Sequence, residues 1–119
     1  MRMWMVNPKF LCNKHLIGEH GEIHKHRHVF VKKYSILGRM SPIVQIEPLM
    51  MLRRHDDLVE EMISRNMNHK SPYSMPDVSY IDQSYLNLKV DVDYSINDLI
   101  TRCGNCKERI INYRKKIMN

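Results

Sequence analysis

The chain contains few cysteines and no long apolar run, and these two features exclude whole classes of protein. Three cysteines are an odd number, which fits a reducing compartment better than a disulfide framework. No segment is long and apolar enough to cross a membrane, and the opening MRMWMV is too short for a signal peptide. We therefore expect an intracellular protein, cytoplasmic or nucleoid-associated, or in the host cytoplasm if the source is viral.

Basic residues outnumber acidic ones, and this excess favours a polyanionic partner. Nineteen Lys and Arg against 13 Asp and Glu give a net charge of +6. Apolar residues make up 43 % of the chain, enough for a packed core at this length. We expect one domain, residues 1–119, with nucleic acid as the first candidate partner.

Apolar periodicity predicts an all-α fold, a small single domain of three main helices with long ordered loops. Residues 1–10 should form an extended N-terminal arm, because a proline at position 8 disfavours helix before it. A first helix should cover about residues 13–34, with Asn13 as its N-cap. Gly18 and Gly21 inside it either admit a ligand close to the backbone or are simply tolerated.

A second helix should begin at Pro42 or Pro48 and end at Asn66 in the left-handed conformation. Its spacing predicts a buried stripe formed by Leu49, Leu52, Val59, Met62 and Ile63.

Residues 67–94 should be mostly ordered loop, with a short β segment possible where 86–93 alternate. Ser95 should cap a third helix that continues to about residue 117, with Asp98 completing an acidic capping box.

The richest chemistry lies in the first predicted helix. Residues three and four apart are neighbours on a helix, so one stripe should carry His15, Glu19, Glu22 and His26. Two carboxylates and two imidazoles make a poor core face but a good catalytic or binding face. The α-amine of Met1 lies a few residues upstream, and its pKa near 8 leaves it partly neutral and nucleophilic at physiological pH.

Two patterns resemble metal sites, and neither is sufficient alone. The order His20-Gly21-Glu22-Ile23-His24 differs from the HExxH metalloprotease motif. We expect a basic DNA-facing stripe instead, formed by His24, His26 and His28 with Lys25, Arg27, Lys32 and Lys33. Cys103 and Cys106 form one C-x-x-C pair, where a zinc ribbon has two such pairs. A structural zinc site needs four ligands. Cys12 and a histidine could complete it; otherwise the pair is an ordinary helical turn.

Three segments together carry a resemblance to a known family. They are Arg2-Met3-Trp4; Leu11-Cys12-Asn13-Lys14-His15-Leu16-Ile17-Gly18-Glu19-His20; and Leu52 to Met62 with the following Asn68-His69-Lys70-Ser71-Pro72. In order and spacing this resembles the pyrimidine dimer DNA glycosylases of the phage endonuclease V type over residues 1–72. The chain beyond residue 73 is similar only through the cysteine pair.

The resemblance implies a combined glycosylase and abasic-site lyase acting on damaged double-stranded DNA, with no metal or cofactor. It implies Met1 as the amine nucleophile and Glu22 as the catalytic carboxylate. We expect DNA-binding roles for the remaining site residues, which are Arg2, His15, Glu19, Lys25 and Arg27. We also expect a monomer with no membrane association.

Two departures from the family pattern leave the lesion open. Gly21 replaces an arginine that phage members carry before the catalytic glutamate, and Met1 itself must serve where phage members expose a new N-terminus. The substrate could be a cyclobutane dimer, another damaged base or an abasic site. The alternatives from other classes are a non-catalytic DNA-binding protein with the same fold, and a small zinc module built on Cys103 and Cys106.

Overall fold

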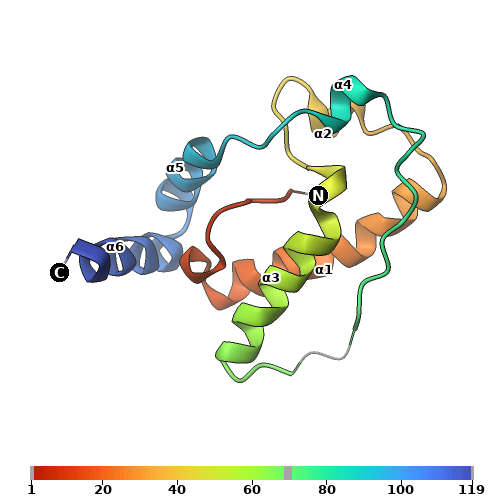
Figure 1. The fold of residues 1–119 in the computed structure, drawn as a ribbon. Coiled ribbons are helices and arrows are strands. Elements are labelled where there is room, and N and C mark those ends of the chain that lie inside the picture. Colours follow the sequence, from red (N-terminus) through yellow and green to blue (C-terminus); the bar gives the residue numbers. More distant parts are fainter. Residues whose placement is uncertain (1, 69–70, 119) are drawn as a thin grey trace.

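A computed structural model describes residues 2–68 and 71–118 (Figure 1). Within these ranges every regular element is helical and no strand forms, which confirms the all-α prediction. The elements in chain order are η1 (Pro8–Phe10), α1 (Asn13–Val31), α2 (Leu37–Met40), η2 (Pro48–Met50), α3 (Met51–Ser64), α4 (Gln83–Leu86), α5 (Val92–Arg102) and α6 (Gly104–Met118). None of these helices is both long and apolar enough to span a membrane.

The N-terminal arm runs through the middle of the molecule. Helix α1 packs against α3 on one side of it, and α5 and α6 lie together on the other side (Figure 1). Its short turn η1 contacts both α3 and α6, and the arm side chains Met3, Val6 and Leu11 are almost fully buried. The arm is therefore a core element that joins the two helical layers, since its apolar side chains are withdrawn from water on both sides.

The buried face of α3 is more polar than its sequence predicts. Leu52 and Ile63 are exposed, whereas Arg54, His55 and Glu61 are buried. The predicted stripe was therefore wrong apart from Met62 and the half-buried Val59. The physical reason is pairing: a charged side chain can lie inside when partners from other segments satisfy it, and spacing does not reveal those partners.

Arg65 fastens the arm to the end of α3. Its guanidinium donates to Glu61 Oε2 (2.8 Å), to the Leu11 carbonyl (2.8 Å) and to the Pro8 carbonyl (3.2 Å), and also to Asn13 Oδ1 (2.9 Å). The chain then turns at Asn66, whose φ of 62° confirms the predicted left-handed end of the helix. One side chain thus binds two carbonyl groups of the arm, those of Pro8 and Leu11, as well as the side chains of Glu61 and Asn13.

The boundaries of the first and third predicted helices required correction. Helix α1 is capped by Cys12, with Asn13 as its first residue. The predicted third helix begins earlier, because the Asp91 carboxylate accepts from the Tyr94 amide (3.1 Å); Ser95 lies inside the helix and is buried.

The third predicted helix is also interrupted. Cys103 has extended backbone angles (φ −132°, ψ 108°) and separates α5 from α6. The alternating segment 86–93 forms no strand, but the predicted loop over 67–94 is interrupted by α4, which ends at Leu86, and by the start of α5 at Val92.

Candidate active site

The carboxylate of Glu22 lies in space against the start of the N-terminal arm, at Arg2. The backbone N–H of Arg2 donates a hydrogen bond to Glu22 Oε2 at 3.1 Å. Glu22 itself is exposed on α1, so the contact leaves the carboxylate open to solvent and to a ligand. Met1, the predicted nucleophile, lies outside the described residues. The hydrogen bond nevertheless fixes the peptide that follows Met1 against the predicted catalytic glutamate.

A pocket of about 250 Å³ opens beside this contact. The Arg2 guanidinium lies over the Trp4 ring, 3.9 Å from its centroid, and its Nη1 contacts Asp98 Oδ2 at 2.5 Å. Trp4 in turn meets the His15 ring edge-on at a centroid distance of 5.8 Å. The side chains of the arm and of the first helical turns thus form one connected wall. Its members include Arg2, Trp4, Lys14, His15, Gly18 and Glu22.

Asp98 is the functional neighbour that sequence reasoning missed. We had assigned it to a helix cap, whereas it holds Arg2 from α5 and also accepts from Arg102 Nε at 2.8 Å. The two residues are 96 positions apart, so no local signal pointed to the pair. An opposite charge on the arginine fixes one orientation of the guanidinium at the pocket mouth.

Glu19 does not share the environment of Glu22. It is buried, and both of its oxygens are taken by Arg54, at 2.5 Å to Nε and 3.0 Å to Nη2. Arg54 also donates to the Val6 carbonyl at 2.6 Å, so the pair ties α1, α3 and the arm together. With no accessible carboxylate, Glu19 has an internal role, and we do not carry it forward as a DNA contact.

Lys25 and Arg27 occupy different sides of α1. Lys25 is exposed three residues after Glu22, and therefore lies on the same side of the helix. Arg27 is half-buried and donates from Nε to the Ser74 carbonyl at 2.6 Å, which ties it to the segment that follows α3. The structure therefore brings Lys25, but not Arg27, to the Glu22 side of α1.

His26 lies one helical turn beyond Glu22 and remains uncharged at neutral pH. Burial and nearby positive charge, including Arg39, lower its pKa to about 4, against a smaller opposing effect of Glu22. Its Nε2 is buried with no hydrogen-bond partner in the part of the chain that the structure describes. The side chain one turn after Glu22 is thus the neutral imidazole of His26, which packs edge-on against the Phe30 ring.

The pyrimidine dimer DNA glycosylase family model matches residues 1–75, which is more than half of the chain. The chain belongs to this family. The family indicates a DNA glycosylase whose substrate is damaged DNA. The matched segment contains the arm, α1 and α3, and hence every wall residue named above, whereas Asp98, which contacts Arg2, lies beyond it. No curated protein matches the chain, and no solved structure matches it either.

In this glycosylase family member, three histidines meet where α1 crosses α3. Their ring nitrogens lie within 4.8 Å of one another, with His24 Nε2 and His55 Nε2 3.0 Å apart and His20 beside them. Asp56 contacts His55 Nδ1 at 2.9 Å, and Tyr73 stacks on the same ring. The predicted DNA-facing role therefore does not fit His24, which packs inside the helix crossing.

A second group with metal-ligand chemistry consists of Cys12, His15, Cys103 and Cys106, all within 4.8 Å. Burial raises the pKa of the Cys106 thiol to about 12, and burial together with Lys14 lowers the pKa of His15.

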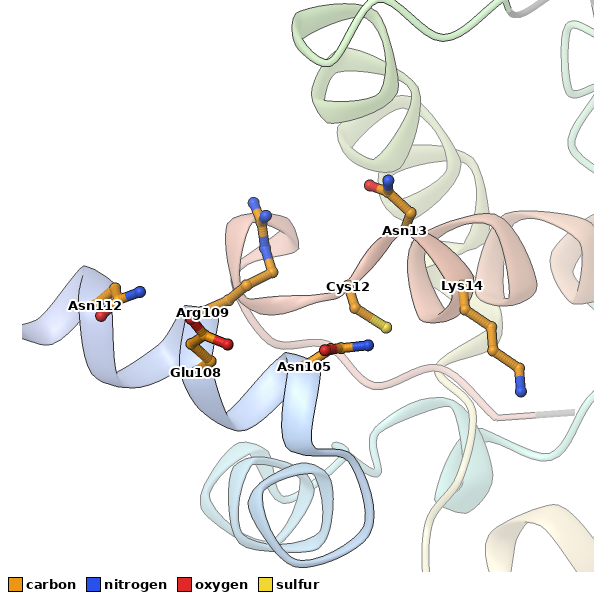
Figure 2. A pocket seen from close by; sticks show the side chains of 7 residues that line it. All are labelled: Cys12, Asn13, Lys14, Asn105, Glu108, Arg109 and Asn112. Carbon is orange, nitrogen blue, oxygen red and sulfur yellow. The ribbon is translucent and has the colours of Figure 1, made fainter.

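A hollow of about 580 Å³ lies next to this group, between the start of α1 and α6 (Figure 2). Lys14 lines both this hollow and the Glu22 pocket, but Arg2 and Glu22 do not line the larger one. The hollow of about 580 Å³ therefore lacks the predicted catalytic residue Glu22 and the predicted DNA contact Arg2.

Proposed function

We propose that the chain is a bifunctional DNA glycosylase and abasic-site lyase whose nucleophile is the α-amine of Met1. The hydrogen bond from the Arg2 N–H to Glu22 carries this proposal, because it places a solvent-accessible carboxylate beside the first peptide of the chain. An amine nucleophile and a nearby carboxylate are the two groups that imine chemistry at a sugar requires. Both groups belong to the protein, so this chemistry needs no cofactor.

The proposed reaction begins when the neutral amine attacks C1′ of the damaged nucleotide. The C1′–N bond breaks, and the base leaves with the electron pair and takes up a proton. The amine then loses a proton, the sugar ring opens as O4′ is protonated, and an iminium ion links the protein to C1′. Glu22 stabilises the positive charge that develops at the sugar, since an oriented carboxylate interacts most strongly with charge formed in the transition state.

The strand is cut in a second step. Removal of a proton from C2′ of the iminium ion forms a double bond, and the C3′–O bond breaks with departure of the 3′ phosphate. Glu22 is the proton acceptor in this step. Water finally hydrolyses the imine and restores the amine.

We propose that Arg2 and His15, which line the Glu22 pocket, contact the DNA. Lys25, on the Glu22 side of α1, and Arg27, on another side of the same helix, would add contacts at the edge of the DNA-binding surface. Contacts of basic side chains with phosphates position the duplex without reading its sequence. A glycosylase reaches its target by taking the nucleotide out of the stack, and the pocket beside Glu22 is where that sugar would enter. We further propose that the protein acts as a monomer on double-stranded DNA inside the cell.

Borohydride trapping tests the mechanism directly. Protein with its native N-terminus is mixed with ultraviolet-irradiated duplex or with abasic-site duplex, then reduced, and the covalent adduct is located by mass spectrometry. We expect an adduct on Met1, and about 10² to 10⁴-fold slower strand cutting in Glu22→Gln, the range of general acid–base effects. The better of the two duplexes identifies the preferred lesion.

Glu60→Gln is the matched control, because Glu60 is an exposed carboxylate on the outer surface of α3. It should cut at the wild-type rate. An adduct on a lysine would refute the N-terminal nucleophile. Binding to damaged DNA with no adduct would instead support the non-catalytic DNA-binding alternative.

Activity should also follow the ionisation of the amine. A free α-amine with a pKa near 8 is protonated and unreactive at low pH, so the trapping rate should rise between about pH 6 and pH 8.5. A flat profile over that interval would contradict the mechanism.

A further inference from the structure

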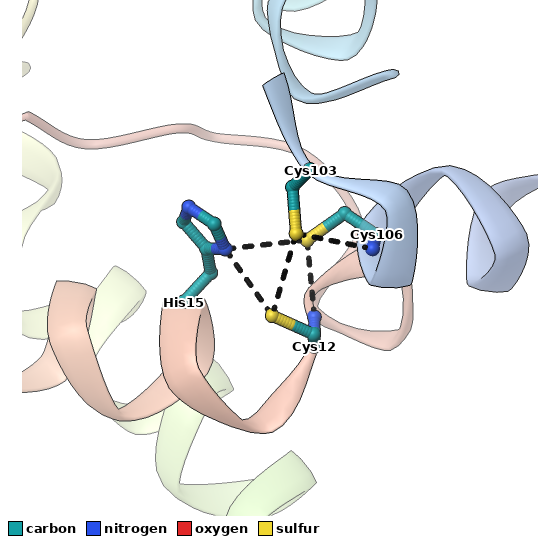
Figure 3. Close-up of side chains that lie close together, drawn as sticks. All are labelled: Cys12, His15, Cys103 and Cys106. Atoms are coloured by element: carbon teal, nitrogen blue, oxygen red, sulfur yellow. Dashed lines mark hydrogen bonds between the residues drawn. The ribbon is translucent and has the colours of Figure 1, made fainter. Parts of the chain in front are cut away.

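Four soft or borderline metal ligands converge where the start of α1 meets the start of α6 (Figure 3). Cys12 and His15 come from the first turn of α1, and Cys103 and Cys106 flank the start of α6. Cys12 and Cys106 are buried, and the other two are half-buried. The group therefore combines two short pairs, C-x-x-H and C-x-x-C, whose corresponding residues are 91 positions apart in the sequence.

The separations between these ligand atoms agree with a tetrahedral zinc site. Zinc–sulfur bonds of about 2.3 Å and zinc–nitrogen bonds of about 2.05 Å place two sulfurs about 3.8 Å apart and a sulfur and nitrogen about 3.5 Å apart. Cys12 Sγ and Cys103 Sγ are 3.8 Å apart, and Cys106 Sγ is 3.5 Å from His15 Nδ1. The remaining measured edge, from Cys12 Sγ to His15 Nδ1, is 3.2 Å.

Backbone amides support the sulfurs as electron-rich groups. The Cys12 N–H donates to Cys106 Sγ at 3.2 Å, and the Cys106 N–H donates to Cys103 Sγ at 3.4 Å. A sulfur that accepts such hydrogen bonds is suited to the thiolate state, which is the state that binds metals. These bonds also orient the ligands from the second coordination shell.

We propose that Cys12, His15, Cys103 and Cys106 bind a structural zinc ion. Three thiolates and one imidazole in tetrahedral arrangement are a ligand set that zinc adopts in structural sites. With all four positions taken by protein, the ion has no open site for water or substrate. This replaces our expectation from the sequence that the protein holds no metal, because the fold supplies the third and fourth ligands that the cysteine pair lacked.

The local backbone also suits this site. Cys103 is the one extended residue between α5 and α6, and Cys106 lies in the first turn of α6. In one continuous helix both sulfurs would project from the same helix face. The break at Cys103 instead lets its side chain leave the backbone in a different direction from that of Cys106.

The ion would join the family-matched segment to the chain that follows it. Cys12 and His15 lie within residues 1–75, and Cys103 and Cys106 lie beyond them. His15 also contacts Trp4, on which the Arg2 guanidinium lies. The zinc site thus fixes one wall of the Glu22 pocket through His15, which acts as a positioning residue.

Metal content of the full chain, produced without a histidine tag in zinc-supplemented medium, is the first test. We expect about one zinc per chain, and X-ray absorption at the zinc edge should report three sulfurs and one nitrogen. Cobalt substituted for zinc should show the visible bands of tetrahedral thiolate coordination. These measurements use the wild-type protein, so they do not depend on whether any variant folds.

Two variants provide the matched comparison. Cys103→Ser/Cys106→Ser should lose the zinc, whereas His24→Ala, which alters the other histidine group, should retain it. Absence of zinc, a disulfide formed by these cysteines in freshly purified protein, or a zinc shell of nitrogen and oxygen would overturn the proposal. Trapping by Met1 does not enter any of these readouts, so failure of the metal site and failure of the proposed chemistry remain distinguishable.

Discussion

The two sides of α1 carry similar residue types in opposite roles. On the side that faces α3, Glu19 is buried against Arg54, and His24 lies in the histidine group with His55. On the side that faces the arm and α5, Glu22 is exposed and accepts a hydrogen bond from the backbone N–H of Arg2, and His15 lines the pocket. Glu19 and Glu22 are separated by less than one helical turn.

This contrast shows that the role of a polar residue on α1 depends on what packs against it. A carboxylate buried against a guanidinium stabilises the fold, whereas an exposed carboxylate such as Glu22 is accessible to solvent and to a ligand. Helical spacing places both glutamates on a single broad stripe. Their environments differ because α3 packs over Glu19 and supplies its partner Arg54.

Glu19→Gln should have the largest effect on folding. It leaves the Arg54 guanidinium buried without a counter-charge, so we expect the free energy of unfolding to fall by about 3 to 5 kcal/mol. Glu22→Gln removes an exposed carboxylate from the same helix and should change it by less than about 0.5 kcal/mol. Urea unfolding measures both variants, and equal losses would contradict the division between the two sides.

His26 should make the pocket side of α1 sensitive to acid. Its pKa is about 4 in the folded protein against an ordinary 6.5, so between these values the unfolded chain binds a proton that the folded chain does not. Stability from this residue is therefore present above pH 6.5 and is lost as the pH falls toward 4. Thermal unfolding of His26→Asn should show a shallower decline over that range than wild type.

His28→Asn is the comparison for that titration, because His28 is exposed and is a minor cause of the lowered pKa of His26. Its decline should be slightly shallower than that of wild type and steeper than that of His26→Asn. A steeper decline in His26→Asn would contradict the assignment.

Asp98→Asn should weaken activity without unfolding the protein. It removes the charge that holds Arg2 at the pocket mouth, and one charge-assisted hydrogen bond in a partly exposed setting is worth about 1 kcal/mol, or roughly a fivefold loss in kcat/KM. Asp93→Asn, an exposed neighbour on α5, should have no effect. Equal loss in both variants would mean that the Arg2 contact is not responsible.

Gly18→Ala should have the smallest effect, and it separates the two interpretations of the glycines. A Cβ at this position meets nothing within 4 Å, so the variant should gain about 0.5 to 1 kcal/mol of stability. We expect weaker binding of damaged duplex because the new methyl group narrows the pocket wall. Gly38→Ala, at a position that does not line the pocket, should leave binding unchanged. If Gly18→Ala also leaves binding unchanged, the helix merely tolerates Gly18 and the glycine has no role in binding.

Local patterns predicted the helical fold, the left-handed end at Asn66 and the family. The family resemblance also predicted Glu22 as the catalytic carboxylate, which stays a prediction; the structure shows that Glu22 accepts a hydrogen bond from the Arg2 N–H of the arm. Periodicity failed on α3 because it assigns charged residues outward, whereas Arg54 and Glu61 have partners from α1 and the arm. Long-range pairs such as Arg2 with Asp98 left no trace in local spacing.

The third predicted helix failed for a related reason. Capping rules favoured Ser95, but Asp91 was equally suitable and acts earlier in the chain. The only local signal for the interruption at Cys103 is the glycine that follows, which lowers helix propensity but does not by itself end a helix.

The hydrogen bonds of Arg65 have a consequence for motion. Because one guanidinium holds the carbonyls of Pro8 and Leu11 as well as Glu61, the arm cannot detach while the last turn of α3 stays in place. The two segments should therefore open as one cooperative unit, and their amide protons should exchange with solvent at a shared rate. Fluctuations at the C-terminal end of α3 would then be transmitted along the N-terminal arm to Arg2 and Trp4 in the Glu22 pocket.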